Sequence, residues 1–281
     1  MDSKVSLNEL VSKHHALGID SQVDYPKIHL YAIIAHSTAI EGSTITVQEN
    51  QVLLDEGTTI PGRTLAEQMM NLDLKEAYDH AIAIARTDAA VTRQDVIALA
   101  AAVMRRTGRT YNTALGTFDS AKGDLRKVNV TAGYGGKSYP SFNKVERLFD
   151  NFCAWLQEVS SEPFAGKTPE EIYRLSFEAH FWLVSIHPWV DGNGRMSRLV
   201  MNMLQYRGGL VPTILLKEDK TEYIKALNES QEKDSPETFV NYMFKIQERN
   251  LRHEIVNYLK TTEKEPAPKK KTFKKSKGKR H

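Results

Sequence analysis

Apolar residues recur at helical spacing along most of the chain. The clearest stretch begins at Thr168, a typical N-cap residue, with Pro169 at the first helical position and Glu171 where a capping box needs it. The apolar positions that follow are three or four residues apart: Ile172, Leu175, Ala179, Leu183 and Ile186. This pattern predicts an α-helix with one buried face, which ends at Pro188.

A second helix is predicted directly after the first. It begins within Gly192-Asn193-Gly194 and ends where Arg207 is followed by two glycines. Further helices are predicted at 28–39, 92–105, 144–159, 220–230 and 236–259. The exception is 124–140, where Val128 and Val130 alternate with polar residues before a glycine-rich turn, which predicts a short β-hairpin. The sequence therefore predicts a mainly α fold with one small hairpin.

Composition fits a globular protein of one large or two modest domains. The chain has 281 residues, of which 41% are hydrophobic and 26% charged. No apolar run reaches the ~18 residues that a membrane span needs, and the first residues lack the apolar core of a secretory signal. The single cysteine, Cys153, cannot form an internal disulfide, which favours a reducing compartment. We therefore expect a cytoplasmic protein without a membrane span.

The positive charge is concentrated at the C-terminal end. Residues 261–281 contain nine Lys and Arg against two Glu, a local charge of +7, which leaves −4 of the total of +3 for residues 1–260. This tail has too few apolar residues to offset the entropy of ordering, so we expect it to be disordered. Basic tails can contact nucleic acid or anionic lipid, but a solvated terminus is the simpler interpretation and no specific nucleic-acid partner is predicted.

One run between the two helices concentrates the candidate chemistry. The N-terminus of a helix presents free N–H groups and the positive end of the dipole, so it is an anion site. Arg195 and Arg198 share a helix face, and each can fork onto a phosphate. Asp191 can hold Mg²⁺, which takes few protein ligands, and His187 can take a proton from a hydroxyl near neutral pH. The full run is His187, Pro188, Trp189, Val190, Asp191, Gly192, Asn193, Gly194, Arg195, Met196, Ser197 and Arg198.

Three other structures share parts of this pattern. An EF-hand loop needs an oxygen ligand, a glycine and a glutamate at its fifth, sixth and twelfth positions. Here these positions are Arg195, Met196 and Asn202, so an EF-hand is excluded. A phosphate loop ending at Gly136-Lys137-Ser138 would need a glycine at Thr131, so it is excluded as well. A simple turn with a satisfied core histidine remains open for His187 taken alone, but it does not require two arginines in register.

The run resembles the signature of the Fic family, His-Pro-Phe-x-(Asp/Glu)-Gly-Asn-(Gly/Lys)-Arg-x-x-Arg. Trp189 stands where Phe is usual and keeps an aromatic anchor. With Gly194 at the variable position, the run resembles the adenylyl-transferring branch of the family. The branch that phosphorylates its targets tends to carry Lys there. The resemblance implies a Fic-fold helical bundle with a β-hairpin flap over the active site. It also implies an N-terminal helical region at 1–89, a catalytic core with C-terminal helices at 90–260, and the basic tail at 261–281.

The resemblance also assigns a role to each residue of the run. His187 would be the general base on a hydroxyl of a target protein, and Asp191 would hold Mg²⁺ against the phosphates of ATP. The hydroxyl would attack the α-phosphorus, pyrophosphate would leave, and AMP would remain on Ser, Thr or Tyr. The phosphate-binding residues would be Gly192, Asn193, Gly194, Arg195 and, for the γ-phosphate, Arg198. The expected partners are protein substrates, including this chain itself, and the sequence leaves a homo-oligomer open.

A second motif of the same family lies near the N-terminus. The stretch from Ser37 to Gly42 resembles the inhibitory motif (Ser/Thr)-x-x-x-Glu-(Gly/Asn), at the end of a helix expected at about 28–42. By this resemblance Glu41 would form a buried charge pair with Arg198, occupy the guanidinium that the γ-phosphate needs, and inhibit transfer. An ordinary helix end with a solvated glutamate is the alternative.

Two further parts of the site follow from their order along the chain. The stretch 126–139 aligns with the family's flap, in which Val128, Asn129 and Val130 would dock an extended target segment by edge pairing. Tyr223 and Gln231 are the residues expected to flank the adenine.

Two other reactions and two non-enzymatic functions are the alternatives to adenylyl transfer. With the same site and Glu41 aligning a water, the chain could remove AMP, or it could transfer another nucleotide or phosphocholine. A non-catalytic module that senses nucleotide would be expected to have a damaged signature, and here every charged member is present. A nucleic-acid-binding regulator, suggested by the tail, lacks room after the core for an appended winged helix.

Overall fold

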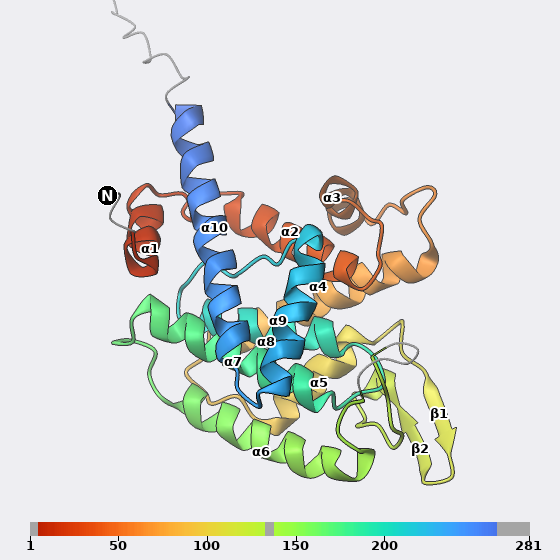
Figure 1. Ribbon diagram of the computed structural model, residues 1–281. Helices are drawn as coiled ribbons and strands as arrows, with labels where there is room; N and C mark the ends of the chain where they lie inside the picture. Colours follow the sequence, from red (N-terminus) through yellow and green to blue (C-terminus); the bar gives the residue numbers. More distant parts are fainter. Residues whose placement is uncertain (1–4, 133–137, 263–281) are drawn as a thin grey trace, which may run out of the picture.

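The structure, a computed structural model, describes residues 5–132 and 138–262. Within them the helices gather around α8 (Asn193–Arg207), which lies inside the molecule (Figure 1). Twelve of its fifteen residues are buried, including polar ones. The helix that begins within the signature run is therefore central, and the packing of the core positions the groups at its N-terminus.

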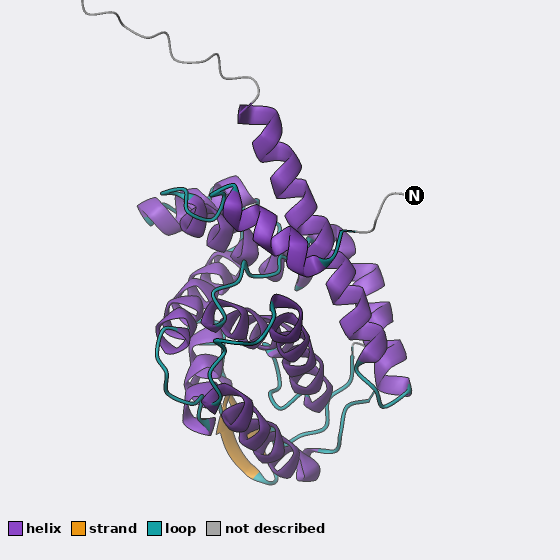
Figure 2. Ribbon diagram, turned by 90° about the vertical axis from the view of Figure 1, so that its left-hand side faces the viewer, coloured by secondary structure: helices purple, strands orange, loops and turns teal. Residues whose placement is uncertain are grey.

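Two apolar clusters meet at α7 (Pro169–Ile186), which packs along α8. The first cluster joins both helices to α4 (Leu65–Ala85), α5 (Arg93–Val103) and α6 (Phe142–Ser161). The second joins them to α1 (Leu7–Ala16), α9 (Lys220–Glu232) and α10 (Glu237–Thr262). α7 serves both because Leu183 faces the first cluster and Phe177 the second. The last turns of α10 extend beyond the body of the molecule (Figure 2).

The helix expected to be inhibitory is α2 (Tyr25–Ile40). It contacts α8, α4, α3 (Val47–Glu56) and the short 3-10 helix η2 (Lys217–Asp219). Ten of its sixteen residues are buried, so α2 is part of the core and not a loosely attached arm. Its C-terminal end is therefore presented to α8 by rigid packing.

The seven helices predicted from the pattern are confirmed, with ends that differ by a few residues. The capping box at Thr168 and Glu171 forms as expected, and α8 begins at Asn193. Three helices were not predicted, although each has a Ser or Thr N-cap and a Glu three residues later: α1, α3 and α4. Among the helices so described, none has the length and apolar character needed to cross a bilayer.

In the stretch predicted as a hairpin, the described residues form one antiparallel bridge, and the regular ladder lies elsewhere. The antiparallel ladder lies earlier, between β1 (Thr110–Thr113) and β2 (Gly116–Asp119), just before the 3-10 helix η1 (Ser120–Lys122). In the described part of 124–140 the pairing is one isolated antiparallel bridge between Thr131 and Ser138, and the glycine-rich turn falls in 133–137, outside the described residues. Thr110 and Tyr111 are residue types with high strand propensity, and Gly116, directly after the two-residue loop, has a positive φ (101°). Most of the basic tail, from 263 onward, is likewise outside the description.

Candidate active site

Hydrogen bonds within the loop between α7 and α8 hold its conformation. The amide of Asn193 spans it: Oδ1 accepts from the backbone N–H of Trp189 (3.1 Å), and Nδ2 donates to the carbonyl of Trp189 (2.8 Å). The Trp189 indole is 2% exposed and donates to the carbonyl of Gly123 (3.0 Å). Gly192 supplies the left-handed conformation (φ 82°) that turns the chain into α8. The expectation of an aromatic anchor at Trp189 thus has a physical basis.

His187 ends α7 with a left-handed backbone (φ 52°, ψ 59°), which is costly for a residue with a Cβ. Its ring Nδ1 lies 3.3 Å from the carbonyl oxygen of Val184. Because a carbonyl can only accept, this contact is a hydrogen bond when Nδ1 carries the proton. The lone pair of Nε2 is then free to act as a base.

The imidazole is held in its neutral form. Burial lowers the pKa of His187 to about 4, and the positive charge of Arg126 acts in the same direction, while Glu41 and Asp191 oppose it. An anionic triphosphate beside the ring would raise this pKa toward the range of a working base. With its pKa at about 4, the ring is unprotonated at neutral pH, which is the form that can accept a proton from a hydroxyl.

The first turn of α8 is shaped for an anion. A Cβ at Gly194 would collide with the Glu41 carboxylate and lie 3.1 Å from Arg198 Nη1, so only glycine lets an anion come this close to the helix. Arg195 is 2% exposed, and its Nε is buried without a hydrogen-bond partner in the described residues. Its two other nitrogens contact the carbonyl of Val103 (3.3 Å), the sulfur of Met104 (3.2 Å) and Oδ1 of Asp191 (3.4 Å). Only part of the guanidinium is thus satisfied by the described residues.

Asp191 lies at the open edge of this turn with 64% of its side chain exposed. One oxygen, Oδ1, accepts from the N–H of Gly192 (2.5 Å) and lies 3.4 Å from Arg195 Nη2. The described residues contain no group of three or more His, Cys, Asp or Glu that could hold a metal ion. Such a lone carboxylate fits Mg²⁺, which keeps phosphate oxygens and waters as its other ligands.

Arg198 contacts both residues expected from the inhibitory motif. Its Nε donates to the hydroxyl of Ser37 (2.8 Å), and its Nη2 donates to the carbonyl of Ser37 (3.0 Å) and to Oε1 of Glu41 (2.5 Å). Burial works against the charge of Arg198, but Glu41 and Tyr223 together outweigh it and raise the pKa of Arg198. Partial burial of Glu41 is likewise outweighed by Arg198, which lowers the pKa of Glu41.

The pair is less enclosed than expected from the sequence. The Arg198 side chain is 4% exposed, but that of Glu41 is 35% exposed. The reason is that Glu41 is the C-cap of α2, at the point where the chain leaves the core. The guanidinium is therefore buried, whereas the carboxylate lies at the mouth of the site.

The end of α2 is closed by a Schellman motif. The N–H of Gly42 donates to the carbonyl of Ala39 (3.1 Å), and the N–H of Ser43 donates to that of Thr38 (3.0 Å). Gly42 has a φ of 108°, a conformation that favours glycine. The glycine of the motif thus turns the chain directly after Glu41.

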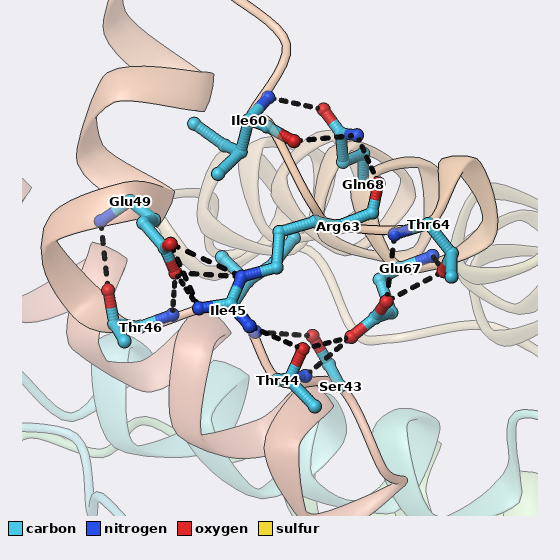
Figure 3. Close-up of polar contacts among 10 residues, drawn as sticks. All are labelled: Ser43, Thr44, Ile45, Thr46, Glu49, Ile60, Arg63, Thr64, Glu67 and Gln68. Atoms are coloured by element: carbon cyan, nitrogen blue, oxygen red, sulfur yellow. Dashed lines mark hydrogen bonds and ion pairs between the residues drawn. The ribbon is translucent and has the colours of Figure 1, made fainter.

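The loop after this turn is tied to α3 and α4 by charged groups (Figure 3). Glu67 accepts from the N–H and the hydroxyl of Thr44 (both 2.7 Å) and from the same groups of Thr64 (3.0 and 2.7 Å). Arg63 donates to both oxygens of Glu49 and to the hydroxyl of Thr44 (2.9 Å). The backbone that carries Glu41 is thus anchored on both sides.

Each of the three residues expected in the flap accepts a hydrogen bond from another residue of the chain. The carbonyl of Val128 accepts from Arg126 Nη1 (2.8 Å), and the carbonyl of Val130 accepts from the N–H of Tyr139 (3.4 Å). Asn129 accepts from the N–H of Phe142 (3.0 Å), which makes it a cap for α6. Docking of a target along this stretch remains a prediction.

The two residues expected at the adenine are not brought together. Gln231 lines a cavity of about 220 Å³ with Tyr139, Trp182 and Ser185, and it donates to the Ser185 hydroxyl (3.0 Å). Tyr223 is 2% exposed, packs in the core, and lies with its hydroxyl 3.0 Å from His180. The two are more than two turns apart on α9, about 12 Å along its axis. Only Gln231 therefore reaches the cavity wall.

Two residues beside His187 were not singled out from the sequence. The ring of Tyr139 stacks on the imidazole, and the guanidinium of Arg126 bonds the His187 carbonyl (2.8 Å). Both lie in the predicted flap stretch. A tyrosine or an arginine in a sequence does not by itself indicate contact with a histidine far along the chain.

The fold and the signature run together define a protein of the Fic class. Residues 90–205 match the family described as Fic/DOC, and the chain belongs to this family. Among curated proteins, the protein adenylyltransferase Fic of Drosophila sechellia is 30% identical over 226 residues, which cover 79% of this chain and 41% of that protein. The protein of the same name from Nematostella vectensis is 29% identical over 227 residues, 79% of this chain and 47% of the relative. The chain thus spans less than half the length of these relatives.

Solved structures have the same fold. A Fic domain containing signaling protein from Bacteroides thetaiotaomicron aligns with a TM-score of 0.71 at 21% identity, covering 90% of this chain and 96% of that one. Fic-1 from C. elegans (residues 134–508) aligns with a TM-score of 0.68 at 22% identity, covering 90% and 73%. The helical arrangement around α8 is therefore that of known Fic proteins.

Proposed function

We propose that this chain transfers AMP from Mg²⁺-ATP to a Ser, Thr or Tyr hydroxyl of a protein and that Glu41 inhibits the transfer. The observation that carries the proposal is the surrounding of Arg198: one buried guanidinium lies beside the first turn of α8 and is occupied by Ser37 and Glu41. The curated relatives are named protein adenylyltransferase, which agrees with this chemistry.

The triphosphate would lie along the first turn of α8. Gly192, Asn193 and Gly194 would offer backbone N–H groups, and the underused guanidinium of Arg195 would bind the phosphate chain. Arg198 would bind the γ-phosphate once Glu41 leaves it. Asp191 would hold Mg²⁺, which neutralises phosphate charge when it is bound.

His187 would take the proton from the target hydroxyl. Its Nε2 is the free nitrogen because Nδ1 faces the Val184 carbonyl. The oxygen then forms a bond to the α-phosphorus, the bond from that phosphorus to the bridging oxygen breaks, and pyrophosphate leaves. Most of the rate enhancement would come from alignment and from charge neutralisation.

Removal of AMP is a second candidate, favoured by one observation. Oxygen Oε1 of Glu41 binds Arg198, and no hydrogen bond to Oε2 is found among the described residues, although the side chain is partly exposed. This oxygen could orient a water toward an AMP-modified side chain. The water oxygen would bond to the phosphorus, the bond from that phosphorus to the side-chain oxygen would break, and free AMP and the restored hydroxyl would leave, so this reaction uses the same site but is not the reversal of transfer from ATP.

The position of the label in ATP tests the proposal. We expect the Glu41→Gly variant with Mg²⁺ to retain label from α-labelled ATP and none from γ-labelled ATP, with a nucleotidyl mass on a hydroxyl residue. His187→Ala in the same background is the control and should lose the label. Retention of γ-label would indicate phosphoryl transfer and contradict the proposal.

A further inference from the structure

Arg126 is a buried cation whose hydrogen bonds go to carbonyl groups. It is 2% exposed, and its guanidinium donates to the carbonyls of His187 (2.8 Å), Val128 (2.8 Å) and Pro140 (2.6 Å). Its own N–H donates to the carbonyl of Pro188 (3.0 Å). Within 5–132 and 138–262 no ion-pair partner is found for it, and burial alone lowers its pKa. A buried charge costs folding free energy unless hydrogen bonds compensate it, and here three backbone carbonyls do so.

Tyr139 covers one face of the His187 imidazole. The ring centroids are 3.6 Å apart and the rings are nearly parallel, at 16°. Such a stack blocks the face of the imidazole and leaves its edge free. Together with the hydrogen bond from Nδ1 to Val184, it fixes the plane of the ring and the direction in which Nε2 points.

One guanidinium holds the backbone on both sides of this stack. Pro140 follows Tyr139 directly, so the bonds from Arg126 to Pro140 and to His187 fix the two stacked residues relative to each other. His187 also has a left-handed backbone, which persists only when its surroundings impose it. The bonds to the carbonyls of His187 and Pro188 supply that constraint.

We propose that Arg126 and Tyr139 are positioning residues that hold the plane and direction of the His187 imidazole. The proposal rests on the proposed function in so far as His187 is the base. Neither residue needs to touch ATP for this role. Their loss should therefore lower kcat and leave the KM for Mg²⁺-ATP nearly unchanged.

The matched pair Tyr139→Ala and Tyr139→Phe tests the stack. In the Glu41→Gly background we expect Tyr139→Ala to lower kcat about 10- to 100-fold, since a small misplacement of a reacting group has effects of this size. Tyr139→Phe keeps the ring and should retain the kcat of its parent. Arg126→Lys keeps the charge but cannot fork onto three carbonyls, so it should lower kcat with the KM retained, provided that its circular dichroism spectrum matches the parent.

A second readout does not depend on transfer. In the full chain with Glu41 present, NMR titration of labelled histidine should show the pKa of His187 rising from about 4 toward 6.5 in Tyr139→Ala and not in Tyr139→Phe. The charged groups that face His187 (Arg126, Glu41 and Asp191) are unchanged in this comparison, so the shift reports on the stack. If Tyr139→Ala alters neither the titration nor kcat, the positioning role is wrong. If the Glu41→Gly parent transfers nothing, the proposed function fails, while the titration still decides the role of the stack.

Discussion

His187 combines a strained backbone with a buried, uncharged ring. Its φ of 52° and its pKa of about 4 both result from surroundings that were built by other segments: α7, the flap stretch and the end of α2. The acid–base chemistry of the site therefore depends on folding, and its protonation should be visible in stability.

Stability should depend on His187 at acid pH. The pKa of the folded state, about 4, lies below the ordinary value of 6.5, so the unfolded chain binds the proton more readily between these values. The stabilisation is fully present above pH 6.5 and is lost as the pH falls toward 4. On going from pH 7 to pH 4, thermal melting should show His187→Ala losing less stability than wild type, by on the order of 2 kcal/mol. Parallel pH profiles would contradict the buried neutral ring.

The residue types of the site and their spacing within one helix could be predicted from the sequence, but contacts between distant segments could not. Spacing within one helix turn placed Arg195 and Arg198 on one face, because the period of a helix is fixed. That Arg198 is buried while Glu41 lies at the mouth of the site depends on how α2 packs on α8. The same is true of Tyr223, whose place in the core follows from the tertiary packing of α9.

At the scale of elements, α2 presents Glu41 because both its end and the following loop are fixed. The Schellman motif turns the chain at Gly42, and Glu67 then holds the loop through two hydrogen bonds from Thr44, while two more from Thr64 fix Glu67 at the start of α4. Hydrogen bonds from Thr44 and Thr64 lower the pKa of Glu67 to about 2. The loop anchor is therefore charged at every ordinary pH.

Neutralising Glu67 should weaken this anchor. A folded-state pKa near 2, below the ordinary 4.5, means that the stabilisation is present above pH 4.5 and is lost as the pH falls toward 2. Glu67→Gln should lower the melting temperature at pH 7 and reduce its further fall between pH 4.5 and 2, as followed by circular dichroism. Glu162, an exposed partner of Lys167, provides the control Glu162→Gln, which should change little. An equal effect of both substitutions would exclude the anchor.

Elements with a strong apolar period were predicted, and those with a weaker signal were missed. α7 has both a capping box and a clear apolar face. α4 has the same kind of capping box, but Asn71 and Asp73 are buried within it and interrupt the apolar pattern. The hairpin at β1 and β2 is only eight residues of strand, and its loop Ala114–Leu115 contains none of the usual turn residues. Local patterns cannot identify an element whose stability comes from its neighbours.

At the scale of the molecule, α10 joins α1 to α2, the helix that presents Glu41. Glu254 accepts from the hydroxyl of Tyr25 at the start of α2 (2.7 Å) and lies 2.8 Å from Nε2 of the buried His14 on α1. His29, one turn further along α2, stacks on Tyr25 with ring centroids 5.3 Å apart. The start of α2 is thus held by α10 and its end by α4.

Removing Glu254 should destabilise the whole domain. Glu254→Ala leaves the hydroxyl of Tyr25 and the ring of His14 without their partner, which costs about 2 kcal/mol in the free energy of unfolding. The matched control is Glu162→Ala at an exposed ion pair, which should cost no more than about 0.5 kcal/mol. Urea unfolding measures both, and equal losses would show that the buried cluster does not join these helices.

Under the proposed function, the Arg198 guanidinium binds either Glu41 or the γ-phosphate of ATP. The most direct measurement is the rate at which the chain incorporates α-labelled ATP with Glu41 and with Glu41→Gly at the same protein and Mg²⁺ concentrations. We predict at least a tenfold increase in the variant, equivalent to about 1.4 kcal/mol, and its loss again when Arg198→Ala is added. Equal rates for the wild type and Glu41→Gly would show that Glu41 does not inhibit transfer.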